Sequence, residues 1–439
     1  MTDLAIVEHM DDCLKWTQKL VEDTSIAAKQ LHYFLPDNGV QYNTSGNISL
    51  NIYNSDDFYF PCDSYLEITG KLYKTGTEDP FGDTDVVGFS NYGHLNLFTL
   101  AKYCMNGAPI ESVGEPGVTA TMLSVALLPN DYRQGISECY YPDTLATVGS
   151  LTDNKGWAER HAFMHNAKGV FQVGIPLSRI FGFAEDYQKV IYGMNHSIIL
   201  TKGTSAGNAL TIKPGSTGTP NTKGDVVLDR IRWVIPRVDP SDVAKYQLIQ
   251  QIENRIVLDC GFRMREYQSA SVEESMNWTW RMGVRSSPEK PRFVLVSFQT
   301  GLRDNQDVNN SVFNHCDLSN ISLMLNNDRY PLNDFTADFT TNQFSNLYWE
   351  FMHFRRAYYG IDPRISSTFV DPLKYKNLYP IYCFDVTRQS ERLKTSVTDI
   401  CLSCVFKTKV PKGTVAHAVI ISDRKIKFKS NGAKMSVVW

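Results

Sequence analysis

The sequence predicts an all-β chain of two tandem jelly-roll β-sandwiches, a double jelly roll, with a few inserted helices and an N-terminal helix. Three observations predict this fold. After Pro36 most periodic segments are short, rich in Val, Ile, Tyr, Phe and Thr, and bounded by Gly, Asn, Asp or Pro, which is typical of strands and turns. The order of these elements in the first half of the chain returns in the second half. At 439 residues the chain is also long for a single hydrophobic core, so two large β units suit its length.

The N-terminal segment differs from the rest because its first thirty residues have a helical pattern. Thr2 can cap a helix, and acidic residues crowd its first half. Apolar residues recur at steps of three and four, at Leu4, Val7, Met10, Leu14 and Leu20 or Val21. We therefore assign residues 1–37 to an N-terminal helical arm.

Strands are expected where β-branched and aromatic residues form short runs between turn residues. The segments that meet this criterion are 64–73, 162–165, 170–173, 197–201, 226–235, 292–298, 399–407 and 415–421. Asn166 to Gly169 would form the turn that joins 162–165 to 170–173.

Helical patterns interrupt the strands in three main places. Residues 116–128 begin with Pro-Gly and carry apolar residues at helical steps. Asp239-Pro240-Ser241 has the cap-then-proline start of a helix that would run to about Ile252. The aromatic segment 343–359 is too long for a strand and predicts a buried helix.

The two halves of the chain share an order of elements. Each has a strand, a turn with asparagine, a helix, and later a strand, a short helix and a strand. The matching turns at Asn106 and Asn326 are 220 residues apart, and the matching later strands at Phe171 and Ile381 are 210 residues apart. A repeat of this length indicates two similar domains and not a solenoid.

The short helices of this repeat are expected at 177–183 and 389–393. Two prolines within 236–240 would break the strand that ends at Ile235, and they mark the boundary between the halves. We therefore expect a first jelly roll over 38–236 and a second over 237–439.

Composition excludes several classes of protein. The 44 Lys and Arg against 47 Asp and Glu give a net charge of -3, so the chain has no global basic field for coating nucleic acid. The sequence has no run of 18 apolar residues, so no transmembrane helix is expected. The N-terminus lacks the pattern of a signal peptide. We expect the protein to fold in the cytosol or nucleus and not to be secreted.

The nine scattered cysteines then indicate free, buried thiols and not a disulfide framework. N-glycosylation sequons occur at Asn43, Asn47, Asn195, Asn277, Asn309 and Asn320. Without secretion we expect them to remain unused, and they reflect loops rich in Asn, Ser and Thr.

Candidate metal ligands do not form a convincing set. His161 and His165, with Glu159 nearby, invite a zinc interpretation, but on the strand expected here residues i and i+4 stand about 13 Å apart. The acidic loop Glu78–Asp85 has the oxygen density of a calcium site without the register of an EF-hand, so a solvated turn is favoured. We expect no metal and no cofactor.

Catalytic motifs are also missing from the sequence. It contains no phosphate-binding glycine loop and no Gly-x-Ser-x-Gly, and no Ser/His/Asp or Cys/His set can be assembled. Cys401 and Cys404 form a lone C-x-x-C whose thiols would point to opposite faces of a strand, which disfavours a redox or zinc role. We expect no catalytic residues and a protein that is not an enzyme.

Two segments each allow two interpretations. Gly203 to Gly224 is a long loop of small residues, either a hairpin tip or a projecting recognition loop. The C-terminal basic residues could face phosphate through counterion release, or guard the polar face of an edge strand. These residues are Lys407, Lys409, Lys412, Arg424, Lys425, Lys427, Lys429 and Lys434, against the single acid Asp423.

Several segments resemble the double-jelly-roll major capsid proteins of double-stranded DNA viruses of the polinton, adintovirus and virophage kind, and their copies in invertebrate genomes. The resemblance covers about residues 38–425. It rests on Ser64-Tyr-Leu-Glu-Ile-Thr-Gly70, Leu97-Phe98, Met105-Asn-Gly-Ala-Pro-Ile-Glu111, Ser287-Pro-Glu-Lys-Pro-Arg-Phe293, Leu325-Asn-Asn-Asp-Arg-Tyr-Pro331 and Phe384-Asp-Val-Thr-Arg-Gln-Ser-Glu391.

The resemblance implies a structural protein that forms homotrimers, whose six upright jelly rolls make a pseudo-hexameric capsomer. Capsomers would tile an icosahedral shell around double-stranded DNA, with penton or minor capsid proteins as further partners. The Gly203 to Gly224 loop would then be an outward tower, and the N-terminal helix and basic C-terminal stretch would be candidates for the inner face. Non-specific contact with packaged DNA would follow, and no small-molecule substrate.

Other classes of function remain open at this point. A tandem β-sandwich lectin or attachment protein would carry exposed aromatic residues at loop tips and stay monomeric. An enzyme would need a deep cleft between the domains lined by titratable groups.

Overall fold

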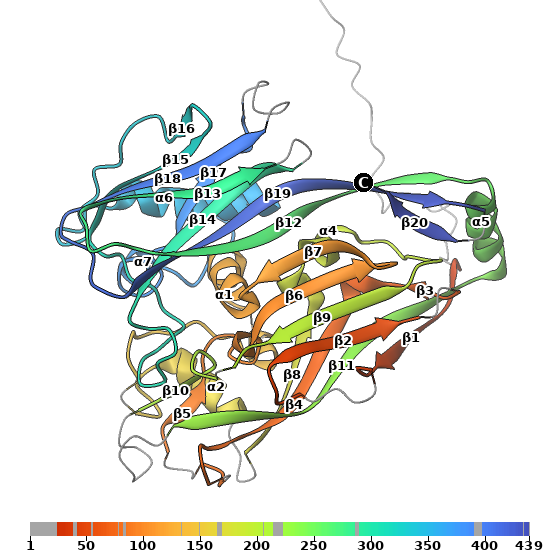
Figure 1. Ribbon diagram of the computed structural model, residues 1–439, viewed down its shortest axis with the longest axis horizontal. Coiled ribbons are helices and arrows are strands. Elements are labelled where there is room, and N and C mark those ends of the chain that lie inside the picture. Colours follow the sequence, from red (N-terminus) through yellow and green to blue (C-terminus); the bar gives the residue numbers. More distant parts are fainter. Residues whose placement is uncertain are drawn as a thin grey trace, which may run out of the picture.

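Two β-sandwiches lie side by side in the computed structural model of the chain (Figure 1). The structure describes residues 24–37, 42–53, 56–77, 79–81, 85–132, 134–148, 150–164, 169–204, 206–213, 223–285, 289–389, 397–432 and 434–438. We call the sandwich built from residues 26–240 the first unit and the sandwich built from residues 257–438 the second unit.

The first unit contains two antiparallel four-stranded layers. One has the order β1-β11-β4-β8, with β3 on β11, and the other has the order β2-β9-β6-β7. A small sheet, β10-β5, lies at one end. The strands are β1 (Ile26–Phe34), β2 (Gly46–Ile52), β3 (Phe58–Tyr59), β4 (Tyr65–Lys74), β5 (Val87–Phe89), β6 (Phe98–Met105), β7 (Ala108–Gly114), β8 (Val170–Pro176), β9 (His196–Lys202), β10 (Leu210–Ile212) and β11 (Gly224–Pro240).

The second unit repeats this arrangement. Its layers have the orders β12-β19-β14-β17, with β20 on β19, and β13-β18-β15-β16. The strands are β12 (Val257–Ser271), β13 (Asn277–Arg285), β14 (Lys290–Thr300), β15 (Leu318–Leu325), β16 (Asp328–Tyr330), β17 (Tyr382–Asp385), β18 (Thr398–Phe406), β19 (Thr414–Ser430) and β20 (Met435–Val438).

Both units have the same nested pairing of strands. If the eight main strands of each unit are ranked along the chain, rank 1 pairs with 8, 2 with 7, 3 with 6 and 4 with 5. One layer therefore has the rank order 1-8-3-6 and the other 2-7-4-5 in each unit. We call these the 1-8-3-6 and 2-7-4-5 layers below. The repeat of elements predicted from the sequence is thus present in the topology.

Helices occupy the connections between strands. The longer ones are α1 (Pro116–Leu127), α2 (Lys155–Met164), α5 (Asp242–Glu253) and α6 (Ser345–Tyr359), and the shorter ones are α3 (Leu177–Ile180), α4 (Gly182–Asp186) and α7 (Pro372–Asn377). Short 3-10 turns lie at η2 (Pro61–Asp63), η3 (Leu95–Leu97) and η4 (Gln134–Glu138). Helices α1 and α6 contact each other between the units.

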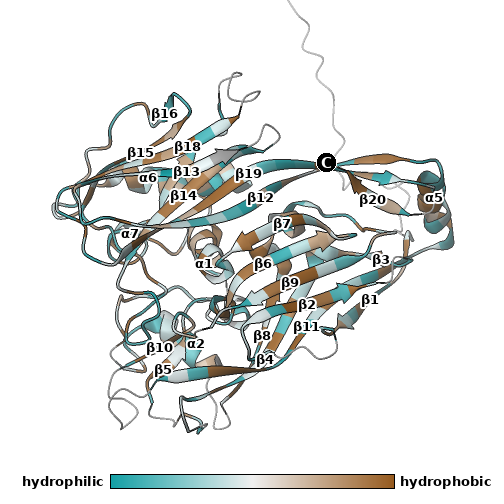
Figure 2. Cartoon of the chain, in the orientation of Figure 1, coloured by the Kyte–Doolittle hydropathy of each residue, from teal (hydrophilic) through white to brown (hydrophobic). Residues whose placement is uncertain are grey.

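Along most strands, buried apolar residues alternate with exposed polar ones, because successive side chains point to opposite faces of the sheet. The strands are therefore banded in apolar and polar colours in Figure 2. β14 is different because seven successive residues, 293–299, are buried. Phe298 faces the sandwich core and meets Trp278, while Phe293 lies on the other face and meets Phe354 of α6. A strand covered on both faces needs a continuous apolar run.

Most elements expected from the sequence are confirmed. The strands at 64–73, 170–173, 197–201, 226–235, 292–298, 399–407 and 415–421 are present, as are the helices at 116–128, 343–359 and after Ser241. The short helix at 177–183 is split into α3 and α4. Most of the helix expected at 389–393 lies outside the described residues.

The helix predicted for the N-terminal arm is wrong for the last part of that arm. Residues 26–34 form β1, which pairs with β11 from Ile26 opposite Pro240 to Phe34 opposite Trp233. Pairing along a whole strand overrides a weak local helix preference. Residues 1–23 of that helix lie outside the described residues.

Two further expectations are wrong. Residues 162–164 belong to α2 and not to a strand, and Asn154 caps that helix by accepting a hydrogen bond from the N–H of Trp157 (3.3 Å). The prolines at 236 and 240 do not end β11, because Pro236 pairs with Leu31 and its carbonyl accepts a hydrogen bond from Phe60 N (2.9 Å). A proline removes a donor from a strand but keeps its acceptor.

Candidate functional site

A buried cluster of charged side chains joins the two units. Glu111 of β7 is 1% exposed, and its carboxylate accepts hydrogen bonds from the backbone N–H groups of Gly182 (3.1 Å), Phe183 (2.9 Å) and Arg265 (2.7 Å). The first two belong to α4, and Arg265 belongs to β12 of the second unit. One carboxylate therefore holds a helix start and a strand of the other unit together.

Arg265 extends this cluster. It is 3% exposed and donates from Nη2 to Glu185 (2.6 Å) and from Nη1 to the carbonyl of Arg179 (2.8 Å). Tyr358 of α6 donates to the same Glu185 carboxylate (2.6 Å). A buried guanidinium needs such partners, because an unpaired buried charge costs several kcal/mol, on the order of 3–5.

A second arginine of β12 binds the next acid of α4. Arg263 forms a bidentate pair with Asp186 and donates to the carbonyl of Tyr358 (2.8 Å). Its guanidinium lies over the ring of Tyr358, 3.8 Å from the centroid. Planar pairing and stacking on one arginine fix its orientation as well as its charge.

Burial shifts the protonation of this cluster. Desolvation raises the pKa of Glu111 to about 7, against the lowering effect of Arg265 and the three N–H donors. The pKa of Glu185 is lowered, because Arg265 and the two tyrosine hydroxyls outweigh its desolvation. These shifts belong to an ion-pair network that joins the two units.

A second contact lies at the end of the molecule that carries β5 and β10. The side chain of Gln306, from the second unit, donates to the carbonyl of Gly224 (2.8 Å) and accepts from its N–H (2.9 Å). The carbonyl of Gln306 accepts from Ile212 N (2.6 Å). Lys223 and Asp307 form an ion pair at 2.6 Å. A loop of the second unit thus continues the backbone pairing of the first.

A third contact is centred on a fully buried ion pair. Arg160 of α2 and Asp143 both have 0% side-chain exposure and lie 3.0 Å apart. Arg160 also donates to the carbonyl of Phe89 (3.0 Å) and to Oδ1 of Asn91 (2.8 Å). The N–H of Asp143 donates to the hydroxyl of Tyr379 in the second unit (2.6 Å). With three separate polar contacts, the units are held in one orientation.

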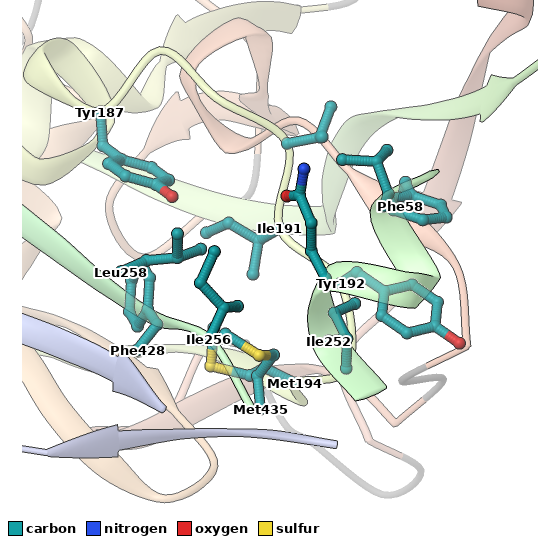
Figure 3. Close-up of a pocket in the computed structure, with 13 residues that line it drawn as sticks. Phe58, Tyr187, Ile191, Tyr192, Met194, Ile252, Ile256, Leu258, Phe428 and Met435 are labelled. Carbon is teal, nitrogen blue, oxygen red and sulfur yellow. The ribbon is translucent and has the colours of Figure 1, made fainter. Parts of the chain in front are cut away.

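A small apolar pocket lies under α5 (Figure 3). Its volume is about 80 Å³. That is smaller than the roughly 300–1,000 Å³ of sites for small-molecule ligands. Tyr187 and Met194 of the first unit meet Phe428 and Met435 of the second unit across it. The pocket is a packing gap between the units with no charged residue in its lining.

The argument against zinc at His161 and His165 rested on an expected strand, and that premise is wrong. His161 lies in α2, stacks on Trp157 at 5.0 Å, and its Nδ1 is 2.6 Å from the carbonyl of Val87. His165 lies outside the described residues. Among the residues that the structure describes, no three of His, Cys, Asp or Glu gather as a metal site.

The cysteine predictions agree with the structure. All eight cysteines in the described ranges are free thiols. Cys404 is buried and Cys401 is half-buried, on opposite faces of β18. Burial raises the pKa of both thiols, which opposes thiolate chemistry. Cys62 and Cys316 are also only half-buried.

The structure describes parts of the Gly203 to Gly224 loop and of the acidic loop Glu78–Asp85. Half of the Gly203 to Gly224 loop is not a free tip: residues 210–212 form β10, and Leu210 is 0% exposed. Its middle, 214–222, lies outside the described residues. Of the acidic loop Glu78–Asp85, Glu78 and residues 82–84 are likewise not described, while Asp85 pairs with Lys74 at 3.3 Å.

The basic C-terminal residues do not lie on an edge strand. β19 pairs with β12 along its length and with β20 near its end. Lys425, Lys427 and Lys429 alternate with the buried Ile426 and Phe428, so the three lysines form one exposed row. We call this set the lysine row. The edge-strand interpretation is therefore wrong for it.

The residues that join the units were missed by sequence reasoning. Glu111 stands in a strand after the buried Ile110, and Arg263 and Arg265 alternate along β12 with the buried Phe262 and Met264. A charged residue at a buried position of a strand indicates a charged or polar partner on a neighbouring element. The partner itself cannot be found from one sequence, since Glu111 and Arg265 are 154 residues apart.

Solved structures with the same fold were found over nearly the whole chain. A chain of the Sputnik virophage matches with a TM-score of 0.62 at 11% identity, covering 99% of this chain and 93% of its own. The mavirus major capsid protein matches with a TM-score of 0.57 at 11% identity, covering 100% and 96%. A chain of the PBCV-1 virus capsid matches with a TM-score of 0.56 at 10% identity, covering 96% and 99%.

No curated protein matches the sequence. In the described part of the chain, no helix combines the length and the apolar character needed to cross a bilayer. The model of the double jelly roll-like domain matches residues 89–426. The two units of equal topology, their likeness to these structures and this match lead to one conclusion: the chain belongs to the double jelly roll-like domain family.

Proposed function

We propose that the protein is a viral major capsid protein and not an enzyme. The observation that carries this proposal is the pair of β units with identical strand orders, locked side by side by polar contacts. Two such units in one chain give a trimer six nearly equivalent sides, so one set of contacts can be reused across a shell. Its chemistry is complementarity between surfaces, and no bond is made or broken.

The finer assignments belong to the same proposal. Each unit is a jelly roll, the first from about residue 26 to residue 240 and the second from about residue 257 onward, joined by α5. Three copies form a pseudo-hexameric capsomer, and capsomers assemble an icosahedral shell around double-stranded DNA. Penton or minor capsid proteins would close the shell. The protein would be made in the host cytosol or nucleus and act in the virion.

The outer and inner faces of the shell are also proposals. The end with β5 and β10 would face outward, and the opposite end with the lysine row would face inward. The β10 pairing supports a rigid base for an outward loop, since a loop held by a strand projects in one direction.

Expression of the full chain, followed by mass measurement in solution and electron microscopy, tests the proposal. We expect a species of three times the 49.7 kDa chain mass, and closed particles under assembly conditions. A chain that stays monomeric in every salt and pH condition would overturn the capsid function. A monomer that binds glycans would support the alternative of a lectin-like or attachment protein.

A further inference from the structure

The two units differ in what covers the outer face of their 1-8-3-6 layers. In the second unit this face meets the first unit through the side chain of Arg265, whose Nη2 donates to Glu185 at 2.6 Å, and through Ser297 of β14, whose hydroxyl lies 3.4 Å from Sδ of Met122 in α1. Phe293 on the same face is covered by Phe354 of α6. The part of the outer face of β12-β19-β14-β17 that carries Arg265, Phe293 and Ser297 is thereby covered.

The same face of the first unit carries exposed apolar side chains. Along β1 and just beyond it, Leu31, Tyr33 and Leu35 are 49%, 54% and 58% exposed. Phe34 lies opposite the buried Trp233 and points inward, so Tyr33 points outward. Isolated exposed apolar residues are common, but three on one face of one edge strand form a patch.

A groove continues this patch across the layer. It has a volume of about 690 Å³ and is lined by residues of all four strands of the layer, among them Leu31, Pro236, Tyr65 and Gly174. Beside it, Arg232 lies over the ring of Tyr33 at 4.8 Å and pairs with Glu67 at 2.6 Å. Lys29, Asp63 and Glu138 also line the groove. Apolar side chains and an aromatic ring beside an arginine and a polar rim are the composition of a protein interface.

The repeat within the chain identifies the occupant. The second unit uses the outer face of its 1-8-3-6 layer to bind the first unit. In a ring that alternates first and second units and reuses one kind of contact throughout, the first unit uses its equivalent face to bind the second unit of the next copy. The strands and helices that would meet it are the equivalents of β7 and α1, which by rank and order are β16 and α6.

Exposed residues are present on that side of the second unit. Trp349 of α6 is 63% exposed, with its ring stacked on His353 at 4.2 Å, and Leu332 after β16 is 80% exposed. β1 and β16 lie at opposite sides of the molecule (Figure 1), so one copy cannot join them by itself. Two different faces on opposite sides give a heterologous contact.

We propose that the outer face of β1-β11-β4-β8, centred on Leu31 and Tyr33, docks on the β16–α6 side of a second copy of this chain. This inference rests on the trimer proposed above and names the surfaces that build it. Burial of Trp349 and Tyr33 at the centre would supply most of the binding energy, as large aromatic residues do in interfaces.

Paired glutamate variants test the two faces. Leu31→Glu with Tyr33→Glu blocks the first face, and Trp349→Glu blocks the second. The matched control is Val243→Glu with Tyr246→Glu on α5, where the side chains are 71% and 69% exposed but lie on neither face. Each protein is checked for an unchanged melting temperature, and its mass is measured by sedimentation at equal concentration.

We expect trimers from the wild type and the α5 control, and monomers from both face variants. A mixture of the two face variants should form dimers, because each contributes one intact face, and no trimers. A face variant that remains trimeric, or a mixture that remains monomeric, would overturn the inference and leave the proposed function standing. A monomeric wild type would instead overturn the proposed trimer itself.

Discussion

Asn106 and Asn326 occupy the same position in the two units and make the same backbone contacts. Each follows the strand of rank 4 and has a left-handed backbone, with φ of 49° and 54°. The Oδ1 of Asn106 accepts from Asn195 N, and that of Asn326 accepts from Asp399 N, both at 2.8 Å. Their backbone N–H groups donate to the carbonyls of the same two residues at 2.9 Å.

This pairing supports a first prediction. Asn326→Ala removes the Oδ1 acceptor and the Nδ2 donor that bonds to Val397 O at 3.0 Å, and it places an alanine in a left-handed conformation. We expect a loss of about 2–4 kcal/mol in the free energy of unfolding, from the conformational cost and the lost hydrogen bonds together. Asn326→Gly should cost about 1–2 kcal/mol less than Asn326→Ala, because glycine adopts this conformation freely.

Denaturant unfolding measures both values, and Asn342→Ala is the matched control. Asn342 also has a left-handed backbone, with φ of 60°, but its Oδ1 accepts only from the Nζ of Lys376, at 2.8 Å. Asn342→Ala should therefore lose mainly the free energy that it costs to hold an alanine in a left-handed conformation. Equal losses at Asn326 and Asn342 would mean that the bonds to the neighbouring strand contribute nothing.

The repeat was predictable because turns and strands leave local signals. An asparagine between a strand and a helix at a 220-residue spacing marks a turn in both units without any knowledge of tertiary contacts. β1 and α2 were not predictable in this way. The side chains of 26–34 fit either periodicity, and it is pairing with β11 that makes them a strand. α2 depends on the cap Asn154 and on burial of Trp157, which is 0% exposed.

The contacts between the units lay beyond sequence reasoning for a different reason. Arg160 and Asp143 are separated by 17 residues, but their pairing makes sense only once Tyr379 of the other unit is placed beside them. A charged residue in an apolar segment indicates a partner, and the fold alone decides which one.

A second prediction concerns the pH dependence of Glu111. Its pKa is about 7 in the fold, against an ordinary value near 4.5 in the unfolded chain. Between these pH values the folded protein holds a proton that the unfolded chain releases. The contribution of Glu111 to the free energy of unfolding therefore falls as pH rises from 4.5 to 7, by about 3 kcal/mol in total, and is constant above.

Glu111→Gln removes this titration. The difference in unfolding free energy between wild type and Glu111→Gln, measured in denaturant from pH 4.5 to pH 8, should decline by that amount. Glu253→Gln at an exposed position on α5 controls for the loss of one charge. A difference that is flat with pH, or that rises, would show that the carboxylate is ionised throughout.

A third prediction compares a buried ion pair with an exposed one. Arg160→Met leaves Asp143 buried without its partner, and we expect a loss of about 3–5 kcal/mol in the free energy of unfolding. Arg364→Met removes the partner of Asp362, but Arg364 is 85% exposed, so the loss should be much smaller than at Arg160. Thermal and denaturant unfolding measure both losses. Similar losses at the two sites would contradict the placement of Arg160 inside the junction of the units.

The lysine row supports the last prediction, which concerns double-stranded DNA. Lys425, Lys427 and Lys429 stand about 7 Å apart along one face of β19, by the rise of two residues per step. The other face buries Phe428 against Tyr187, with ring centroids 5.5 Å apart, so the row has a rigid support. Asp259 lies 3.8 Å from Lys427, and both side chains are largely exposed. Such a weak pair leaves the positive charge available to phosphate.

If the row contacts DNA phosphates, each contact releases counterions and steepens the salt dependence of binding. Changing the three lysines to glutamine should then reduce the slope of log affinity against log salt by about 3 for a short duplex. Fluorescence anisotropy between 50 and 200 mM salt, about the range in which such slopes are resolved, measures it. The control changes Lys407, Lys409 and Lys412 to glutamine, an equal loss of charge on a different surface segment. Because charge alone cannot distinguish the two variants, a slope that falls equally in both would assign the effect to net charge, and a fall confined to the lysine row would assign it to that face of β19.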